Sequence, residues 1–455
     1  MSIILDFLCN KRNIIKSSKA ESITFIRYLR YFFLLIRTCI RLLQVIQYKK
    51  NEGRSVMRKI SFIHAADLHL DSPFVGLKTL PRFIYKKIQE STFYAFQTLI
   101  NEAIQRKVDF VVFAGDLYDG ENRSIRAQIR FREGMKRLQE AGIEVFIVHG
   151  NHDHLNGNWT TIQMPGNVHV FHSSVETKRF QKVDGTIVHL YGFSYPNKHV
   201  YEPMIDEYQK VGGAHFHIGI LHGHDRSSKE HYSYAPFTVE KLLEKQFNYW
   251  ALGHIHKRQI LHEHPYIVYP GNIQGRNKKE SGEKGAYYVE INEYESNIEF
   301  FETADCEWVK ETIDGTTITT VDFLIDTCER IKDKCRLTNK NVFLQLELLN
   351  VTEAVDEEEL MMILQDGEEL KQPFVWVYEV NKVGHASFEY WNEFQGDFFE
   401  QLKSSFRRFE EVDEALVPLF ENMQTRKFID KLTEDEKEAI LEQSKSIMFQ
   451  LLKNQ

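Results

Sequence analysis

Residues 109–119 read DFVVFAGDLYD, an apolar run that ends in a glycine and carries carboxylates at Asp116 and Asp119. A short apolar run bounded by turn residues predicts a strand that is buried on both faces. Apolar residues at helical spacing precede this strand over 81–107 and follow it over 126–141. This alternation indicates β–α–β units and parallel strands. Asp116 then lies at the carboxyl end of a buried strand, where α/β proteins gather ligand-binding side chains.

The same arrangement, a predicted strand followed by polar residues, recurs along the chain. The further clusters are Asp67-Leu68-His69 after 60–64, Gly150-Asn151-His152-Asp153 after 144–148, His222 after 218–221, and Gly253-His254-Ile255-His256 after 249–252. Each cluster alone is a weak signal, because Asp-x-His is common, a loop histidine is usually solvated and Asn-His-Asp can cap a helix. Their joint occurrence at strand ends indicates one composite site.

The residue types in these clusters suit two divalent metal ions. Carboxylates, imidazoles and an amide oxygen, without thiolate, favour Mn, Fe, Zn or Ni. Two such ions lower the pKa of an attacking water and offset the charge of a phosphodiester. Asp116 is the natural bridge between them, because a carboxylate has two oxygens. Gly115, Gly150 and Gly253 each precede a cluster, where the missing side chain relieves crowding and allows a tight turn.

Two assignments near these clusters are less direct. His224 is the rival to His222, and we favour His222 because it follows the predicted strand immediately. A basic stretch that includes Arg276 and Lys284 either contacts a phosphate backbone or forms a solvated loop, and the sequence leaves both interpretations open.

The composition sets limits on the class of protein. A net charge of −8 argues against a surface that is basic throughout, but it is compatible with a nuclease whose metal ions supply local positive charge. The cysteines number 5 and form no Cys-x-x-Cys pair, so we expect no disulfide framework and a cytoplasmic location.

Residues 1–56 differ in kind from the rest of the chain. They contain 11 Lys and Arg against 3 Asp and Glu, a net +8 that leaves −16 for the remainder. Their longest clean apolar stretch, 31–36, is far below the roughly 20 residues that span a bilayer, so no stable membrane span is predicted. One interpretation is an amphipathic helix on lipid or on a partner. The one we favour is upstream sequence ahead of a native start at Met57.

After residue 305 the pattern becomes that of a smaller domain. A helix over 321–334, a strand over 342–349, an acidic helix over 356–365 and a strand over 374–378 indicate an α+β cap. The region from Trp391 is charged and has an amphipathic helical pattern. The predicted domains are a basic N-terminal extension (1–56), a catalytic domain (57–303), an α+β capping domain (304–385) and a helical C-terminal region (386–455).

The order D-x-H, G-D-x-x-D, G-N-H-D, H and G-H-x-H resembles the signature of calcineurin-like metallophosphoesterases. A closer likeness, to the SbcD/YhaO-type DNA repair exonuclease family, is carried by FIHAADLHLDSPF (62–74), FAGDLYD (113–119), VHGNHD (148–153), LHGH (221–224), ALGHIHK (251–257), YPGNIQGR (269–276) and KGAYYVEI (284–291). The resemblance implies an α/β fold, a four-layer sandwich of two mixed β-sheets flanked by helices, with a small α+β cap and terminal helices.

The resemblance also implies roles for individual residues. One ion would be held by Asp67, His69, Asp116 and His256, and the other by Asp116, Asn151, His222 and His254. His152 would contact the phosphate or protonate the leaving oxygen, and Asp153 would orient His152. Some nucleases of this group have a second active-site histidine where this chain has Asp119, so a second histidine-assisted role loses its support here.

The function predicted from this resemblance is a two-metal-dependent phosphodiesterase, a DNA exonuclease or other nuclease in DNA repair that uses Mn²⁺. Its expected partners are DNA ends or single strands and an SMC-like, SbcC-type ATPase bound by the C-terminal helices; a homodimer is also compatible. The alternatives are a phosphoesterase that acts on a nucleotide or another small phosphoester, and a non-catalytic assembly scaffold. The complete ligand set argues against the scaffold, and the extra region after residue 305 argues against a minimal small-molecule enzyme.

Overall fold

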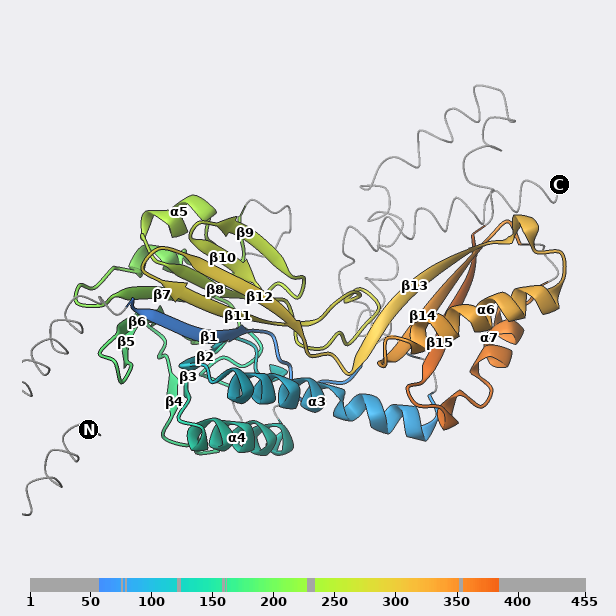
Figure 1. Ribbon diagram of the computed structural model, residues 1–455, viewed down its shortest axis with the longest axis horizontal. Coiled ribbons are helices and arrows are strands. Elements are labelled where there is room, and N and C mark those ends of the chain that lie inside the picture. The colour runs from blue at the N-terminus through green and yellow to red at the C-terminus, as the bar shows by residue number, and fades with distance from the viewer. Residues whose placement is uncertain are drawn as a thin grey trace, which may run out of the picture. The chain divides into compact units, whose positions relative to one another are not determined.

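The computed structural model describes residues 57–383, except 75–76, 78–79, 121–123, 158–159, 161, 227–233 and 352–354. The predictions for residues 1–56 and for the helical region over 386–455 lie outside the described residues. The described strands form two six-stranded sheets and one three-stranded sheet (Figure 1).

The first sheet is built around β2 (Phe110–Ala114), the strand that the sequence predicts most strongly. Its order is β12-β11-β1-β2-β3-β4. The other strands are β1 (Lys59–Ala65), β3 (Glu144–Val148), β4 (Val168–Val170), β11 (Gly285–Asn292) and β12 (Ser296–Glu302). Strands β1 to β4 pair in parallel, whereas β11 and β12 form an antiparallel pair. The loops that follow β1, β2 and β3 therefore leave the sheet at the same edge.

The second sheet has the order β5-β6-β7-β8-β10-β9. Its strands are β5 (Glu176–Gln181), β6 (Ile187–Gly192), β7 (Phe216–His222), β8 (Tyr249–Gly253), β9 (Gln259–Glu263) and β10 (Tyr266–Tyr269). The four inner strands pair in parallel, and β5 and β9 join the two edges in antiparallel fashion. Both sheets are therefore mixed.

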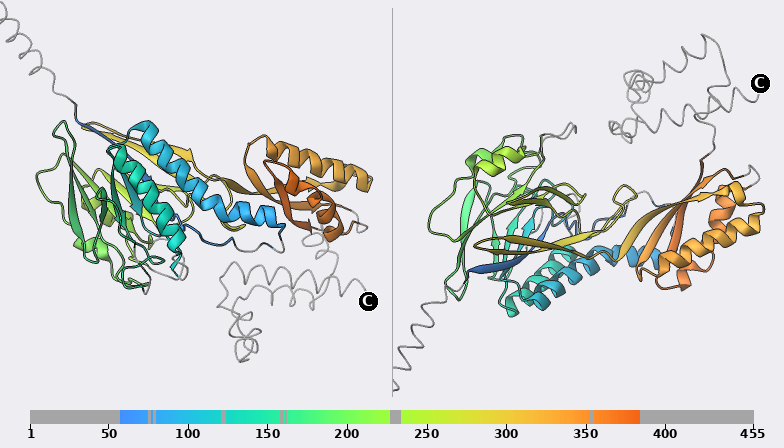
Figure 2. Two further views of the ribbon diagram at one scale, coloured as in Figure 1. Left: turned by 90° about the horizontal axis from the view of Figure 1, so that it is seen from below. Right: turned by 45° about the horizontal axis from the view of Figure 1, so that its top comes forward.

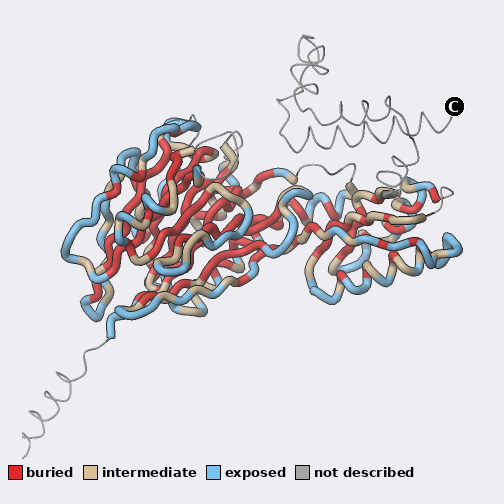
Figure 3. The backbone as a smooth tube through the Cα atoms, turned by 90° about the horizontal axis from the view of Figure 1, so that it is seen from above, coloured by how far each residue is buried: buried red, intermediate tan, exposed pale blue. Residues whose placement is uncertain are grey.

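The side chains of β2 show why the two sheets pack together. Phe110 and Val112 belong to a buried cluster shared with Ile218 of the second sheet, whereas Val111 and Phe113 face the other way. Both faces of the strand are thus buried, as its unbroken apolar run predicts, and burial concentrates in the sheet strands (Figure 3). Each such side chain contributes about 1.5–3 kcal/mol when fully buried.

Helices cover the outer face of each sheet. α3 (Arg82–Arg106) and α4 (Ile125–Glu140) run side by side over the first sheet, and their buried residues share a cluster with it (Figure 2). α5 (Val239–Glu244) and the short helix η2 (Met204–Glu207) contribute to the cluster on the second sheet. The order helix, sheet, sheet, helix confirms the predicted four-layer α/β sandwich.

The third sheet forms the predicted cap. It consists of β13 (Cys306–Asp314), β14 (Asn341–Leu349) and β15 (Val375–Val383), all parallel, with α6 (Val321–Arg336) and α7 (Glu357–Gln365) packed on it, and short helices η3 (Gly315–Thr317) and η4 (Glu368–Leu370). A second apolar cluster joins Trp308 and Phe343 of this sheet to Ile84 and Ile88 of α3. The cap is thereby attached to the helix that covers the first sheet.

Strands β5, β9 and β13 and the helix α5 were not predicted from the sequence. β5 reads ETKRFQ and β9 reads QILHE, and each lies at the edge of its sheet. Edge strands are commonly polar, so they lack the apolar run that identified the inner strands. Among the described helices, none is both long and apolar enough to cross a bilayer.

Candidate metal centre

The predicted ligands lie at the carboxyl ends of strands from both large sheets. Asp67 and His69 follow β1, Asp116 follows β2, Asn151 follows β3, His222 ends β7, and His254 and His256 follow β8. The first two loops stay paired beyond the sheet, because the backbone N–H of His69 donates to the carbonyl of Asp116 at 3.0 Å. The sheet topology therefore brings together residues that are far apart in the sequence.

The backbone at several of these residues is strained. The φ angles of Asp67, His69, Asp116 and His254 are 52°, 42°, 51° and 101°, all in the left-handed region. A non-glycine residue in that region costs of order 1–3 kcal/mol. Such conformations persist where surrounding contacts hold them, and they are typical of functional sites.

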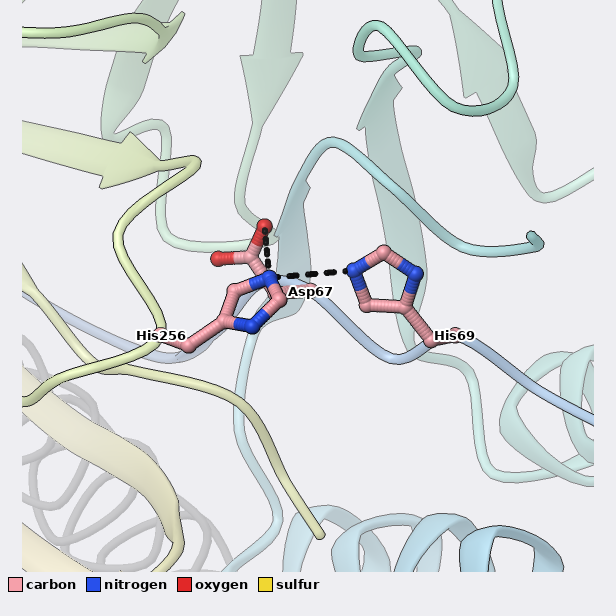
Figure 4. Close-up of side chains that lie close together, drawn as sticks. All are labelled: Asp67, His69 and His256. Carbon is pink, nitrogen blue, oxygen red and sulfur yellow. Dashed lines mark hydrogen bonds and ion pairs between the residues drawn. The ribbon is translucent and has the colours of Figure 1, made fainter. Parts of the chain in front are cut away.

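Asp67, His69 and His256 form the first group of potential ligands, and their side chains point toward one another (Figure 4). The Nε2 atoms of His69 and His256 lie 3.1 Å apart, and Nε2 of His256 lies 4.0 Å from Oδ1 of Asp67. Asp116 adjoins this group, with its Oδ2 atom 3.8 Å from Nε2 of His69. These four residues are the set that the resemblance implies for one ion.

Asp116, Asn151, His222 and His254 form the second group. Nε2 of His222 lies 3.4 Å from Oδ2 of Asp116 and 3.0 Å from Oδ1 of Asn151. The Asn151 oxygen also lies 3.3 Å from Nδ1 of His254. Asp116 therefore adjoins both groups, as a bridging carboxylate would. His224 instead lies against the His254 ring, with centroids 6.0 Å apart, so His222 is the histidine that faces Asp116 and Asn151.

The far nitrogens of two histidines are held by partners outside the centre. Nδ1 of His222 donates to the carbonyl of Ala114 at 2.9 Å, which leaves Nε2 to face the ligand oxygens. Nδ1 of His256 lies 2.7 Å from a carboxylate oxygen of Glu280. Histidines that bind metal ions are commonly oriented in this way. Sequence reasoning missed Glu280, because it lies in a loop without a strand-end motif and only the folded chain brings it to His256.

Burial shapes the electrostatics of the centre. It holds the pKa of His69 well below its usual range, with the positive charge of Arg276 acting in the same direction, and it lowers the pKa of His254 to about 3. Both imidazoles are therefore neutral, which is the form that binds metal. Burial also raises the pKa of Asp67 to about 6. For Asp116, burial acts to raise the pKa, but the charge of His222 outweighs it and holds that pKa well below the usual range.

The three glycines that precede ligand clusters are needed for space, which confirms that prediction. A Cβ atom on Gly150 would lie 2.4 Å from Oδ1 of Asp116 and 2.6 Å from Nε2 of His222. A Cβ on Gly253 would lie 1.8 Å from the carbonyl oxygen of Ala114, and one on Gly115 would lie 2.1 Å from Nδ1 of His222. Any side chain at these positions would displace a predicted ligand or the backbone behind it.

His152 lies beside the ligands and is partly exposed, with 39% of its side chain accessible. Its Nδ1 atom lies 2.8 Å from Oδ1 of Asp119, and its backbone N–H donates to Asp116 at 2.9 Å. The expected pairing with Asp153 needs correction. Asp153 is fully buried and accepts bonds from the backbone of Gly150 and Leu117 and from the ring of His149. Asp153 therefore holds the backbone of the loop after β3 in place and does not orient His152.

Arg276 connects the surroundings of His152 and His256. Its side chain is 12% exposed, and one Nη donates to the hydroxyl of Ser72 at 2.8 Å, which in turn donates to Oδ2 of Asp119 at 2.6 Å. Its other Nη lies 3.6 Å from Glu280, the carboxylate behind His256. The solvated-loop interpretation is therefore wrong for Arg276. Lys284 also points inward and donates to the carbonyl of His256 at 3.0 Å.

The donor set fits divalent metal ions. Carboxylate and imidazole atoms of Asp67, His69 and His256, and of Asp67, Asp116 and His222, lie within 4.8 Å of one another. Two facing imidazole nitrogens, a buried carboxylate pair and an amide oxygen are an expensive arrangement without a cation between them. The chemistry of these donors therefore matches the ions that the sequence predicts.

The fold and this centre define a class, and comparison with known proteins agrees with it. Residues 60–258 match the model of the calcineurin-like phosphoesterase family. The chain belongs to this family of metallophosphoesterases, and it is accordingly a metal-dependent phosphoester hydrolase.

Particular relatives narrow the resemblance. The chain is 38% identical to the uncharacterized metallophosphoesterase YhaO of Bacillus subtilis over 409 residues, which cover 88% of this chain and 99% of that protein. It is 26% identical to the DNA double-strand break repair protein Mre11 of Thermoplasma acidophilum, over 51% of this chain and 64% of that protein. The Mre11 protein of Methanocaldococcus jannaschii is also 26% identical, over 54% and 66% of the two chains.

Proposed function

We propose that this chain is a two-metal nuclease that hydrolyses phosphodiesters of DNA in repair. The observation that carries the proposal is that the predicted ligands lie next to one another at the strand ends, with His152 beside them and partly exposed. One ion would be held by Asp67, His69, Asp116 and His256, and the other by Asp116, Asn151, His222 and His254. Bound ions supply charge that offsets the phosphate and lowers the pKa of water. We propose Mn²⁺, which suits this nitrogen and oxygen donor set.

His152 would act as the general acid toward the leaving oxygen. Its Nδ1 is occupied by Asp119, so Nε2 is the atom that can give a proton to the substrate. Burial by itself lowers the pKa of His152, but the hydrogen bond to Asp119 and the charge of Asp116 raise it above its usual value. A raised pKa favours the protonated ring, which is the form that a general acid requires.

The relatives support a DNA substrate. The two Mre11 proteins carry names that describe DNA double-strand break repair. The cap, β13 to β15 with α6 and α7, adds a surface beyond the two sheets that a small phosphoester does not need. We propose that an SMC-like ATPase binds the region after residue 386.

The test is hydrolysis by the purified chain. With Mn²⁺ we expect cleavage of labelled single- or double-stranded DNA and of bis(p-nitrophenyl) phosphate. Asp116→Asn should fold normally yet lose most bound metal and more than about 100-fold of both activities, since even outer partners of metal ligands are worth 10–100-fold. His172→Ala, whose side chain is 79% exposed, is the control and should retain both activities.

The outcomes test the DNA substrate and the two-metal assignment separately. Cleavage of the generic diester without any cleavage of DNA would favour a small phosphoester substrate. Near-normal turnover by Asp116→Asn would contradict the two-metal assignment itself.

A further inference from the structure

A cavity of about 400 Å³ lies next to the candidate metal centre. Its walls come from the loop that follows β1, including Ser72 and Phe74, and from the first turns of α3, including Tyr85, Ile88 and Gln89. Cavities of this size are typical of small-molecule sites. None of the residues described above as metal ligands lines it.

Hydrogen bonds join the cavity wall to His152. Ser72 lies in the wall, and its hydroxyl donates to Oδ2 of Asp119 at 2.6 Å. The other oxygen of Asp119 lies 2.8 Å from Nδ1 of His152. A single carboxylate therefore separates the wall from the proposed general acid. A group attached to a phosphate at His152 can reach this cavity, because only Asp119 stands between His152 and Ser72 of the wall.

The described lining of the cavity offers no cation to a phosphate. No lysine, arginine or histidine is among the described residues that line it. Among the described lining residues the charged one is Asp71, whose carboxylate already accepts from Ser124 and from Arg126. From these described residues an anion would meet one carboxylate and no cation, so the lining favours an uncharged ligand.

The remaining walls suit a flat ring with a polar edge. Phe74 and Ile88 belong to the apolar cluster beneath the cap. Tyr85 is 53% exposed and offers a ring face. Within the described part of the chain, neither the Tyr85 hydroxyl nor the Gln89 amide has a hydrogen-bond partner. An amide offers both a donor and an acceptor, the combination that pairs with the edge of a nucleobase.

We propose that this cavity is a subsite for the nucleobase next to the scissile phosphodiester. The proposal rests on the proposed function, because it takes the substrate to be a nucleic acid strand. Tyr85 stacks on the base, and Gln89 bonds to its edge. Stacking on an aromatic ring tolerates every base, so the subsite accepts all four.

The first experiment measures binding alone. Ligand-observed NMR with the metal-free full chain would follow thymidine and deoxyadenosine as probes. We expect both nucleosides to bind, and Tyr85→Ala and Gln89→Ala each to weaken binding about tenfold or more. The matched control is Tyr94→Ala, on the same helix, 44% exposed and outside the cavity, which should bind like the parent. Equal binding by the Tyr85 and Tyr94 variants, or no binding by the parent, overturns the subsite.

The second experiment locates the base relative to the cleaved bond. With Mn²⁺, the substrates are an oligothymidylate and two matched strands with an abasic residue on one or the other side of the cleaved phosphate. Tyr85→Ala should raise KM about tenfold for the intact strand. It should leave KM unchanged for the abasic strand that lacks the base expected to occupy the cavity. The Tyr94→Ala control should change neither value.

The two experiments distinguish the possible failures. Nucleoside binding that Tyr85→Ala weakens, without cleavage of any strand, sinks the proposed nuclease function and leaves the base-binding cavity standing. If Tyr85→Ala changes KM equally for intact and abasic strands, the cavity does not hold the base next to the scissile bond, and that placement is overturned.

Discussion

His152 and Asp119 carry the sharpest prediction at the scale of single residues. His152→Ala should reduce kcat roughly 10²–10⁴-fold, the usual cost of a lost general acid. The metal content should stay at two ions, because Nδ1 of His152 bonds to Asp119 and its ring only packs edge-on against His69, with centroids 5.0 Å apart. Activity assays combined with metal analysis of the purified variant would check both parts.

A variant of Asp119, the hydrogen-bond partner of His152, tests the same assignment. Asp119→Asn keeps an acceptor for Nδ1 of His152 but removes the negative charge, so its loss should be smaller than that of His152→Ala. If His152→Ala instead lost as much metal as Asp116→Asn, the histidine would be a ligand and the assignment of a general acid would be wrong.

At the scale of elements, the turn after β3 depends on the absence of one side chain. Gly150→Ala would place a carbon atom 2.4 Å from Oδ1 of Asp116 and 2.6 Å from Nε2 of His222. We expect overpacking to lower the free energy of unfolding by about 1–3 kcal/mol and to abolish tight metal binding. Gly212→Ala is the control, because nothing lies within 4 Å of its Cβ position. Thermal unfolding and metal titration would compare the two variants. If Gly150→Ala were as stable and bound metal as tightly as Gly212→Ala, the predicted crowding at Gly150 would be wrong.

A second prediction at this scale concerns a buried carboxylate in the cap. Glu368 is fully buried, accepts from the backbone of Val375 at 2.6 Å and from Arg336 at 2.7 Å, and lies 3.2 Å from the buried ammonium of Lys332. Burial acts to raise its pKa, but the backbone hydrogen bond and the two cations outweigh it and lower the pKa.

A carboxylate with a depressed pKa stabilises the fold above its unfolded pKa, about 4.3 for glutamate. That stabilisation is lost as the pH falls through the lower, folded value. Glu368→Gln should remove this acid dependence and lower the free energy of unfolding by about 1–3 kcal/mol at neutral pH, because Lys332 would keep only the more exposed Glu329 as its carboxylate partner. Thermal unfolding between pH 7 and pH 3 tests this. Glu347→Gln, which breaks the more exposed pair with Lys310, should change stability by less than about 1 kcal/mol.

At the scale of the whole molecule, catalysis and partner binding should be separable. β15 ends at Val383, so a chain truncated after residue 390 keeps every described element. We expect it to bind metal and hydrolyse diesters like the full chain while losing the proposed ATPase. Pull-down with the candidate ATPase from the same genome, beside a diester assay, would test this. Retained binding, or collapse of the catalytic domain, would assign the C-terminal region to the core.

The sequence predicted much of this molecule because its signals are local. An apolar run such as 110–114 must be buried on both faces, and Asp116 follows it directly, so the strand and the position of the carboxylate could be read together. The glycines before the clusters were recognisable for the same reason. The edge strands β5 and β9 were not, because half-exposed polar strands carry no comparable pattern.

The tertiary structure alone decided which side chains support the site. Asp153 adjoins His152 in the sequence, yet the turn directs its carboxylate to the backbone of Gly150 and Leu117, and Asp119 from another loop takes the expected role. The sequence likewise did not predict the contact of Glu280 with His256 or the inward direction of the Arg276 side chain. A ligand at a strand end follows from the local pattern of its own strand, whereas a supporting contact depends on how separate loops pack, and spacing along the chain does not encode that.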